Sequence, residues 1–183
     1  SRAKPVIAIK SGRTQESARA AATHTGALAG GDEAVGAAFR RAGIVRVDEL
    51  EELFVAAETL TWLKPVPGNA LMIVTNGGGA GVLAVDQLID GGGELSDLSP
   101  ETIATLDKAL PATWSRANPV DIIGDAPAAR WDAALKAVAA DEGVDAILAI
   151  NCPTGLASSL EAASGVIGAV EKGMIGRKPV LAC

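Results

Sequence analysis

From residue 70 onward the chain alternates short apolar runs with longer segments of helical character. Apolar runs cover residues 70–75, 146–150 and 179–183, whereas helices are expected from about 81 to 90, from Ser99 onward, over 128–140 and over 156–172. A strand followed by a helix and another strand requires a crossover connection, which makes neighbouring strands parallel and covers the sheet with helices. This pattern predicts an α/β fold.

A proline- and glycine-containing segment, residues 64–69, separates this region from the first third of the chain. Neither a helix nor a strand is expected to pass through two prolines and a glycine. We therefore predict a first domain over residues 1–64, a linker over 65–69 and a second domain over 70–183. The first apolar strand, residues 4–10, begins with almost no preceding sequence, so we expect the first domain to be incomplete.

Within the first domain, residues 14–22 are rich in helix-forming side chains and are followed by glycines, which places His24 on a loop. Asp32 is expected to cap a helix that ends before Gly43, and residues 44–47 form a short strand. Asp48 then caps a second helix that runs to about residue 63. Apolar residues recur at helical spacing in that helix and should face a core: Leu50, Leu53, Phe54, Ala57 and Leu60.

Composition excludes several classes of function. The 22 acidic and 16 basic residues give a net charge of −6, and no lysine or arginine cluster indicates a nucleic-acid partner. No apolar run approaches the ~20 residues that span a bilayer, and the first residues do not resemble a signal peptide, so we expect no membrane association and a cytoplasmic location. Cys152, Cys183 and a single histidine do not form a metal-binding pattern, so no metal site is predicted.

The first candidate site is His24, the only histidine, which lies between two threonines and is followed by Gly26. A neutral imidazole nitrogen can attack a phosphoryl or acyl group, and nearby backbone N–H groups can bind the anion that results. An ordinary surface histidine is the alternative interpretation of the same residues.

The second candidate site is the turn Asn76-Gly77-Gly78-Gly79-Ala80-Gly81, between an apolar strand and a helix. The first N–H groups of a helix and the positive end of its dipole can bind a phosphate without a lysine. We predict that the N-terminus of this helix is exposed rather than buried. No Walker lysine and no dinucleotide-binding pattern follow, and a tight turn without a ligand is the alternative.

Four segments together resemble the NDP-forming (ADP-forming) acyl-CoA synthetase family, relatives of succinyl-CoA synthetase. They are Lys10-Ser11-Gly12-Arg13-Thr14, Thr23-His24-Thr25-Gly26-Ala27-Leu28-Ala29-Gly30, Thr75-Asn76-Gly77-Gly78-Gly79-Ala80-Gly81-Val82 and Asn118-Pro119-Val120-Asp121. The resemblance implies two flavodoxin-like, succinyl-CoA-synthetase-like domains, the first of which bears a phosphohistidine. Thr23 stands where serine is more usual. For Asn118-Pro119-Val120-Asp121, a turn with an Asx cap and a substrate contact are both open.

The resemblance also implies a reaction and its partners. An acid, CoA and a nucleoside triphosphate would interconvert with acyl-CoA, a nucleoside diphosphate and phosphate, and His24 would carry the phosphoryl group. Thr25, Gly26 and residues 76–81 would form a phosphate cradle. CoA and ATP or ADP with Mg²⁺ would bind mainly in a CoA-binding domain and an ATP-grasp domain outside this chain, so the isolated chain should be inactive. A small carboxylic acid is the expected substrate, and a homo-oligomer is left open.

Two alternatives belong to other classes of function. A ligase-like module could sense CoA or acyl-CoA without turnover and regulate a fused protein acetyltransferase. A receiver-like or flavodoxin-like domain could instead bind a small anion at residues 76–81, with His24 incidental. An acidic cluster at the strand ends would favour a receiver, and Asp86 and Asp90 lie within or after a helix instead.

Overall fold

The structure of the protein, a computed structural model, describes residues 4–25, 31–63 and 66–183, with the backbone alone described at His24 and Thr25. The chain forms two compact units, one ending at Leu63 and the other beginning at Lys64. Pro65, the first residue of the predicted linker, lies outside the described residues. Each unit combines a parallel sheet with helices, which confirms the predicted α/β fold class.

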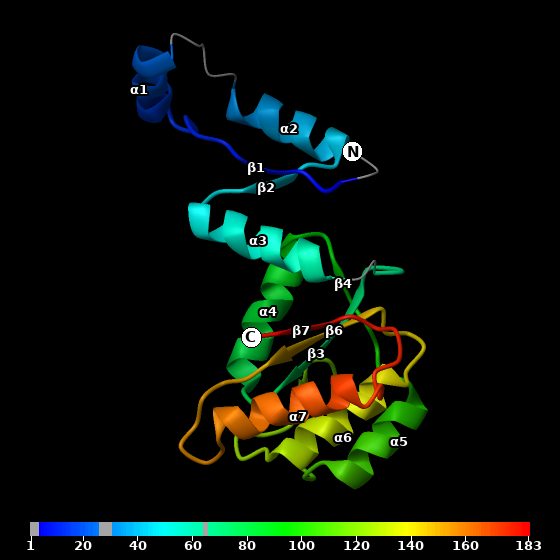
Figure 1. Ribbon diagram of the computed structural model, residues 1–183. Helices are drawn as coiled ribbons and strands as arrows, with labels where there is room; N and C mark the ends of the chain where they lie inside the picture. Colours follow the sequence, from blue (N-terminus) through cyan, green and yellow to red (C-terminus); the bar gives the residue numbers. More distant parts are fainter. Residues whose placement is uncertain (1–3, 26–30, 64–65) are drawn as a thin grey trace. The chain divides into compact units, whose positions relative to one another are not determined.

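The first unit contains two short parallel strands and three helices (Figure 1). Its elements are β1 (Ile7–Ile9), α1 (Gln15–Thr25), α2 (Asp32–Ala42), β2 (Val45–Val47) and α3 (Leu50–Trp62). β1 pairs with β2 in the register Ile7 to Val45. Gly43 ends α2 in the left-handed conformation, with φ of 67°, and glycine reaches this conformation without the steric cost of a Cβ atom.

The helix caps of this unit differ from the predicted ones. α2 is capped by Gly31, and the carboxylate of Asp32 accepts two hydrogen bonds from Arg46 at 2.8 and 2.9 Å instead of capping the helix. α3 is capped at Glu49 rather than Asp48, and the Glu52 carboxylate accepts hydrogen bonds from the N–H groups of both residues. The ion pair and the reciprocal capping box explain both shifts.

The prediction that the apolar face of α3 is buried was wrong. Leu50 and Phe54 are 61% and 64% exposed, and no residue of α3 is buried. Among the described residues of the first unit, only Val47 and Gly36 are buried. A sheet of two short strands offers too little apolar surface to bury the apolar face of α3.

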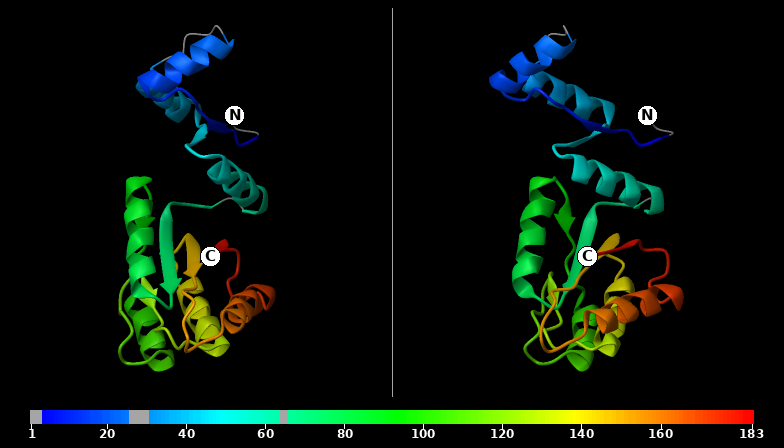
Figure 2. Two further views of the ribbon diagram at one scale, coloured as in Figure 1. Left: turned by 90° about the vertical axis from the view of Figure 1, so that its left-hand side faces the viewer. Right: turned by 60° about the vertical axis from the view of Figure 1, so that its left-hand side comes forward.

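The second unit is a five-stranded parallel sheet with helices on both faces. Its elements are β3 (Ala70–Thr75), α4 (Gly78–Asp90), β4 (Glu94–Leu95), α5 (Pro100–Ala109), β5 (Val120–Asp121), α6 (Ala128–Ala139), β6 (Ala146–Ile150), α7 (Ser159–Glu171) and β7 (Val180–Ala182). The strand order is β4-β3-β6-β7, and β5 also pairs with β3. In both views of Figure 2, α4 lies on one side of β3, and α6 and α7 lie on the other.

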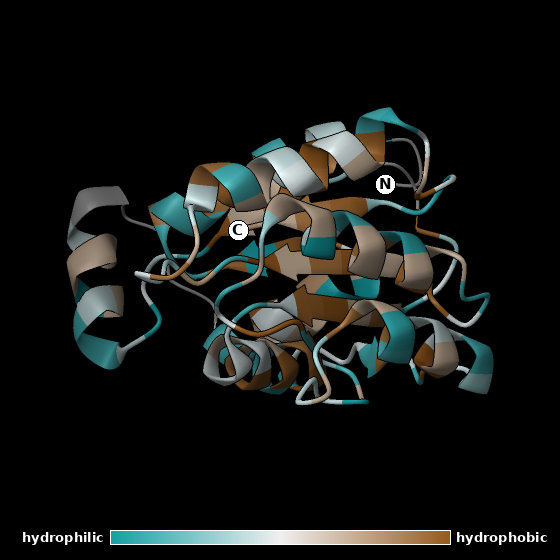
Figure 3. Cartoon of the chain, turned by 90° about the horizontal axis from the view of Figure 1, so that it is seen from below, coloured by the Kyte–Doolittle hydropathy of each residue, from teal (hydrophilic) through white to brown (hydrophobic). Residues whose placement is uncertain are grey.

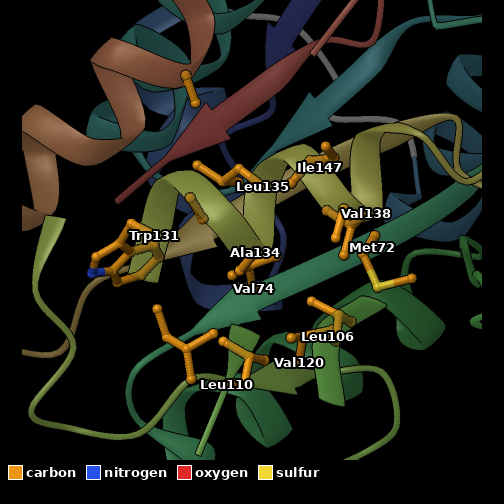
Figure 4. Packing of buried hydrophobic residues seen from close by; sticks show 14 of the residues in the cluster. Met72, Val74, Leu106, Leu110, Val120, Trp131, Ala134, Leu135, Val138 and Ile147 are labelled. Carbon is orange, nitrogen blue, oxygen red and sulfur yellow. The ribbon is translucent and has the colours of Figure 1, made fainter. Parts of the chain in front are cut away.

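The core of this unit lies between the sheet and the layer of α5, α6 and α7 (Figure 4). Met72 and Val74 of β3 and Leu135 and Val138 of α6 have no exposed surface. Figure 3 shows the same division, with largely apolar strands inside and polar residues on the outer turns of the helices. β3 is buried on both faces because helices cover both, as expected of a central parallel strand.

Two strands of two residues each, β4 and β5, were not predicted, and they pair with the same edge of β3. β4 pairs with the start of β3 and β5 with its end, and between them the side chain of Asn118 bonds to the edge of β3. Its Oδ1 accepts a hydrogen bond from Ile73 N at 3.0 Å, and its Nδ2 donates to Leu71 O at 2.8 Å and Ser96 O at 2.9 Å. Asn118 therefore satisfies backbone groups that no strand covers, which gives this residue of the Asn118–Asp121 motif a structural role.

Candidate functional site

The sheet of the second unit reverses its winding direction at β3. The strand that follows β3 in the chain, β4, pairs with one edge of β3, whereas β6 pairs with the other. In open α/β sheets, ligands bind outside the carboxyl ends of the strands at such a switch point. The residues at this place are Asn76 after β3 and Asn151 and Cys152 after β6.

The side chain of Asn76 joins the two strand ends. It is 5% exposed; its Oδ1 accepts a hydrogen bond from Cys152 N at 2.7 Å, and its Nδ2 donates to Cys152 O at 3.0 Å. A weaker contact of 3.4 Å joins Nδ2 to Asn151 Oδ1. Asn76 was predicted as part of a phosphate cradle, but these bonds engage its side chain with β6. Its position fixes where the following glycines lie.

The N-terminal end of α4 is open. Gly77 N donates to Thr75 Oγ1 at 3.0 Å, and Ala80 N and Gly81 N donate to Gly77 O at 3.1 and 3.2 Å. Gly78 and Gly79 are exposed, and the hydrogen bonds of the described residues give their N–H groups no protein acceptor. The predicted exposure of this helix end is confirmed, and two N–H groups are free to bind an anion.

The glycines of this turn differ in how tightly they are packed. A Cβ atom at Gly77 would lie 2.5 Å from Cys152 Sγ, and one at Gly81 would lie 3.0 Å from Pro119. By contrast, nothing lies within 4 Å of a Cβ atom at Gly79. Gly77 and Gly81 are therefore required by packing, whereas Gly79 leaves open space at the helix end.

Asp121, at the end of β5, lies beside this helix end and was not predicted as a site residue. Its Oδ2 is 2.9 Å from the position that a Cβ atom of Gly78 would take. Its Oδ1 accepts a hydrogen bond from Ile123 N at 2.9 Å, which forms an Asx turn. A carboxylate here interacts favourably with the helix dipole and opposes the binding of a second anion. Because β5 has only two residues, no local signal in the sequence marks Asp121 as part of this site.

The loop after Asp121 is held in an unusual conformation. Ile123 has φ of 70°, which is rare for a β-branched residue and costs on the order of 1–2 kcal/mol. Arg130 of α6 anchors the loop by donating hydrogen bonds to Ile122 O at 3.0 Å and Asp125 Oδ1 at 2.5 Å. The hydrogen bond from Arg130 lowers the pKa of Asp125. The loop is thus fixed beside the switch point.

The structure places His24 in the last turn of α1, so the prediction that it lies on a loop was wrong. The helix extends beyond residue 22 because three alanines, which favour helix, precede Thr23. The Thr23 hydroxyl donates a hydrogen bond to Ala20 O at 2.7 Å, so its polar group is satisfied within the helix. Of the other residues of the predicted cradle, Gly26 lies outside the described residues, and only the backbone of Thr25 is described, in α1.

Two family models match the chain. Residues 1–60 match the succinyl-CoA ligase like flavodoxin domain, and residues 71–179 match the Ligase-CoA domain. The acetate–CoA ligase [ADP-forming] I of Archaeoglobus fulgidus is 44% identical over 167 residues, which is 91% of this chain and 24% of that protein. The chain belongs to the NDP-forming acyl-CoA synthetase family.

Other members of this family match over nearly the whole chain. The alpha subunit of acetate–CoA ligase [ADP-forming] II of Pyrococcus furiosus is 38% identical over 98% of this chain and 39% of that subunit. The solved structure of dinucleotide forming acetyl-coenzyme A synthetase 1 of Ca. Korarchaeum cryptofilum, in complex with phosphate and ADP, is 36% identical over 98% of this chain and 38% of that chain, with a TM-score of 0.88. The chain therefore spans between about a quarter and two fifths of the length of these relatives.

Membership of the NDP-forming acyl-CoA synthetases covers both units of the chain and includes the segments around His24 and Asn76. Within the part of the chain that the structure describes, no helix is long and apolar enough to cross a membrane. The same described residues contain no group of three or more histidine, cysteine, aspartate or glutamate side chains that could hold a metal ion.

Proposed function

We propose that this chain is part of an NDP-forming acid–CoA ligase, which interconverts an acid, CoA and a nucleoside triphosphate with acyl-CoA, a nucleoside diphosphate and phosphate. The similarity to ADP-forming acetate–CoA ligases across both units carries the proposal. The small carboxylic acid, CoA, and ATP or ADP with Mg²⁺ are the proposed substrates and cofactors. A CoA-binding domain and an ATP-grasp domain, in the same chain or in a partner subunit, would bind CoA and nucleotide.

His24 is proposed to carry the phosphoryl group. In the direction that consumes acyl-CoA, the unprotonated imidazole nitrogen attacks the phosphorus of an acyl phosphate. An N–P bond forms, the bond between phosphorus and the acyl oxygen breaks, and the acid leaves as its carboxylate. The phosphoryl group then passes to the nucleoside diphosphate, which restores the imidazole. Thr25 and Gly26 would contribute to the phosphate cradle around it.

The open end of α4 is proposed as the part of the cradle in the second unit. The free N–H groups of Gly78 and Gly79 supply hydrogen-bond donors, and the dipole of the helix favours negative charge. Asn76 would act by positioning these glycines, Gly77, Ala80 and Gly81 would shape the turn, and Asp121 would limit how tightly the phosphate is held. A phosphate that must be passed on benefits from binding that is not too strong.

The regulatory alternative has no specific observation in its favour. The relatives described above are named as ligases or synthetases, and they match through both units. The receiver-like alternative requires an acidic cluster at the strand ends, and no metal-binding group of acidic side chains occurs in the described residues. We therefore propose neither.

The test of the proposal is acyl-CoA formation from short acids, CoA and ATP in an assembly that contains the CoA-binding and nucleotide-binding domains. His24→Ala is expected to abolish turnover without unfolding the protein, because His24 is the only imidazole in the chain. Thr23→Ser, which keeps the hydroxyl, serves as the matched control and should retain activity. Turnover by His24→Ala at the wild-type rate would refute the proposal. The 183-residue chain alone should form no acyl-CoA.

A further inference from the structure

The part of the first unit that carries His24 is tied at both ends to one group of ion pairs. Arg13 lies just before α1, and Asp32 is the first residue of α2. Both side chains form ion pairs with residues at the end of β2, which are Asp48 and Arg46 respectively. Residues 14–31, which we call the His24 segment, therefore begin and end at the same place in the unit.

The four side chains form a continuous network. Arg46 Nη2 donates to both carboxylate oxygens of Asp32, at 2.8 and 2.9 Å. Arg13 Nη1 lies 2.6 Å from Asp48 Oδ1, and Arg46 Nε lies 3.6 Å from the same oxygen. The order is thus Arg13–Asp48–Arg46–Asp32, and within the described residues no ion pair joins Arg13 directly to Asp32. Any energetic link between these two residues must pass through β2.

The middle of the network belongs to the framework of the unit. Arg46 is the central residue of β2, which pairs with β1 along its length. Asp48 N donates to Glu52 Oε2 at 2.8 Å, in the first turn of α3. The guanidinium of Arg46 also lies against α2, because a Cβ atom at Gly36 would be 3.2 Å from its Nη1. Two members of the network are therefore held by β1, β2 and α3, whereas the other two are the ends of the His24 segment.

This network differs from an ordinary surface ion pair. Isolated exposed pairs contribute little because water screens them, as expected of Arg19 and Glu16 on α1, which are 3.7 Å apart and 78% and 77% exposed. The side chains of Arg46 and Asp32 are only 24% and 33% exposed, and their hydrogen bonds join two full charges. Ion pairs that share members in a network are also coupled energetically.

We propose that this network positions His24 for phosphoryl transfer. Its four members act as positioning residues: they hold both ends of the His24 segment on the framework, so that α1 presents the imidazole in one place. Phosphoryl transfer is sensitive to such placement, since a displacement of about 1 Å can slow a reaction by about 100-fold. The inference rests on the proposed function of His24. It gives a role to Arg13, a residue of the Lys10–Thr14 segment to which the resemblance assigns none.

The test measures how fast ADP removes a labelled phosphoryl group from His24, in the assembly that contains the CoA-binding and nucleotide-binding domains. Arg13→Met and Asp32→Asn change opposite ends of the segment, and each is expected to slow the transfer by about tenfold or more. The KM for CoA should not change, because CoA is proposed to bind mainly outside this chain. Arg13→Lys, which keeps the charge, should restore most of the rate, and Arg19→Met serves as the control with wild-type transfer. Wild-type rates in both end variants would overturn the proposal.

A double-mutant cycle tests whether the two ends act through one network. The variant that combines Arg13→Met with Asp32→Asn should transfer about as slowly as the slower single variant, and Arg46→Met should resemble it. Residues without contact and without shared partners have independent effects, which would multiply. A double variant slowed by the product of the two single effects would show that no network connects these residues, and the proposal would be wrong.

A purely structural role is excluded by a variant that weakens the same unit without removing a charge. Val47→Ala truncates a buried side chain of β2 next to the network. It should lower the unfolding midpoint of the unit and leave the transfer rate unchanged at temperatures well below unfolding. Transfer rates that follow the unfolding midpoints in all variants, Val47→Ala included, would reduce the network to a stabilising one and refute the positioning role.

The same experiment separates this inference from the proposed function. No label on His24 in the wild-type assembly would refute the proposed function, and the positioning role with it. Label on His24 that Arg13→Met and Asp32→Asn transfer to ADP at the wild-type rate would leave the proposed function intact and refute the positioning role alone.

Discussion

Replacing Asn76 by alanine is expected to destabilise the second unit substantially. The Asn76 side chain makes two short hydrogen bonds to the backbone of Cys152, at 2.7 and 3.0 Å, and Cys152 is only partly exposed. The substitution leaves a backbone N–H and a backbone C=O without their partners. At about 1–3 kcal/mol for each unsatisfied group, and with partial access of water, we expect a loss of about 2–4 kcal/mol.

The assay is urea unfolding of the second unit. Because two units unfold in one chain, the fluorescence signal must report on one of them. A Trp62→Phe background leaves Trp114 and Trp131, both buried in the second unit, as the only tryptophans. The midpoint for Asn76→Ala should fall while the slope stays constant.

The matched control is Asn69→Ala, which removes the same atoms from an exposed position before β3. Its effect should stay within about 0.5 kcal/mol. A loss below about 0.5 kcal/mol for Asn76→Ala, equal to that of the control, would refute the argument that this side chain holds the ends of β3 and β6 together.

Three further predictions concern other parts of the second unit. Burial alone would raise the pKa of Asp141, but hydrogen bonds from Ser99 and other neighbours hold this pKa below its ordinary value of 3.8. The ionised carboxylate therefore stabilises the fold above about pH 4, and this stabilisation is lost at lower pH. Asp141→Asn should flatten the acid limb of the curve of unfolding free energy against pH, and an unchanged curve would contradict this. Gly165→Ala places a Cβ atom 2.6 Å from a carbonyl oxygen of α6 and should destabilise the unit by about 1–3 kcal/mol, whereas Gly155→Ala, with nothing within 4 Å, should be neutral in the same urea assay. Asp121→Asn removes the charge beside the open end of α4 and should strengthen sulfate binding by about three- to tenfold at low salt, measured by calorimetry; unchanged affinity would argue against an anion site there.

The sequence predicts the elements of the second unit well because their signals are local. Ser99 accepts a hydrogen bond from Thr102 N and begins α5, as its capping preference indicates, and the apolar run 146–150 forms β6. β4 and β5 escape prediction because two residues carry no periodicity. Between these two strands Asn118 bonds to the edge of β3, and its partners lie 22 to 47 positions away in the chain.

The candidate site is predicted only in part, for a related reason. The open end of α4 follows from its glycines and from the strand before it, which are neighbours in sequence. The involvement of Asp121 and the hydrogen bonds of Asn76 to Cys152 depend on which strand ends meet, and this is decided by the sheet order. The glycines that follow His24 predict a loop, whereas the alanines that precede it extend α1 to Thr25.

The measurement that tests the central claim most directly is the transfer of a phosphoryl group to His24. Acyl-CoA and labelled phosphate would be added, without nucleotide, to the assembly that contains this chain, and the labelled peptide would be identified by mass spectrometry. We predict one acid-labile, alkali-stable phosphoryl group on His24, which is lost when ADP is added and is absent in His24→Asn. Acyl-CoA synthesis at the wild-type rate without label on His24, or label on another residue that is transferred to ADP, would contradict the account.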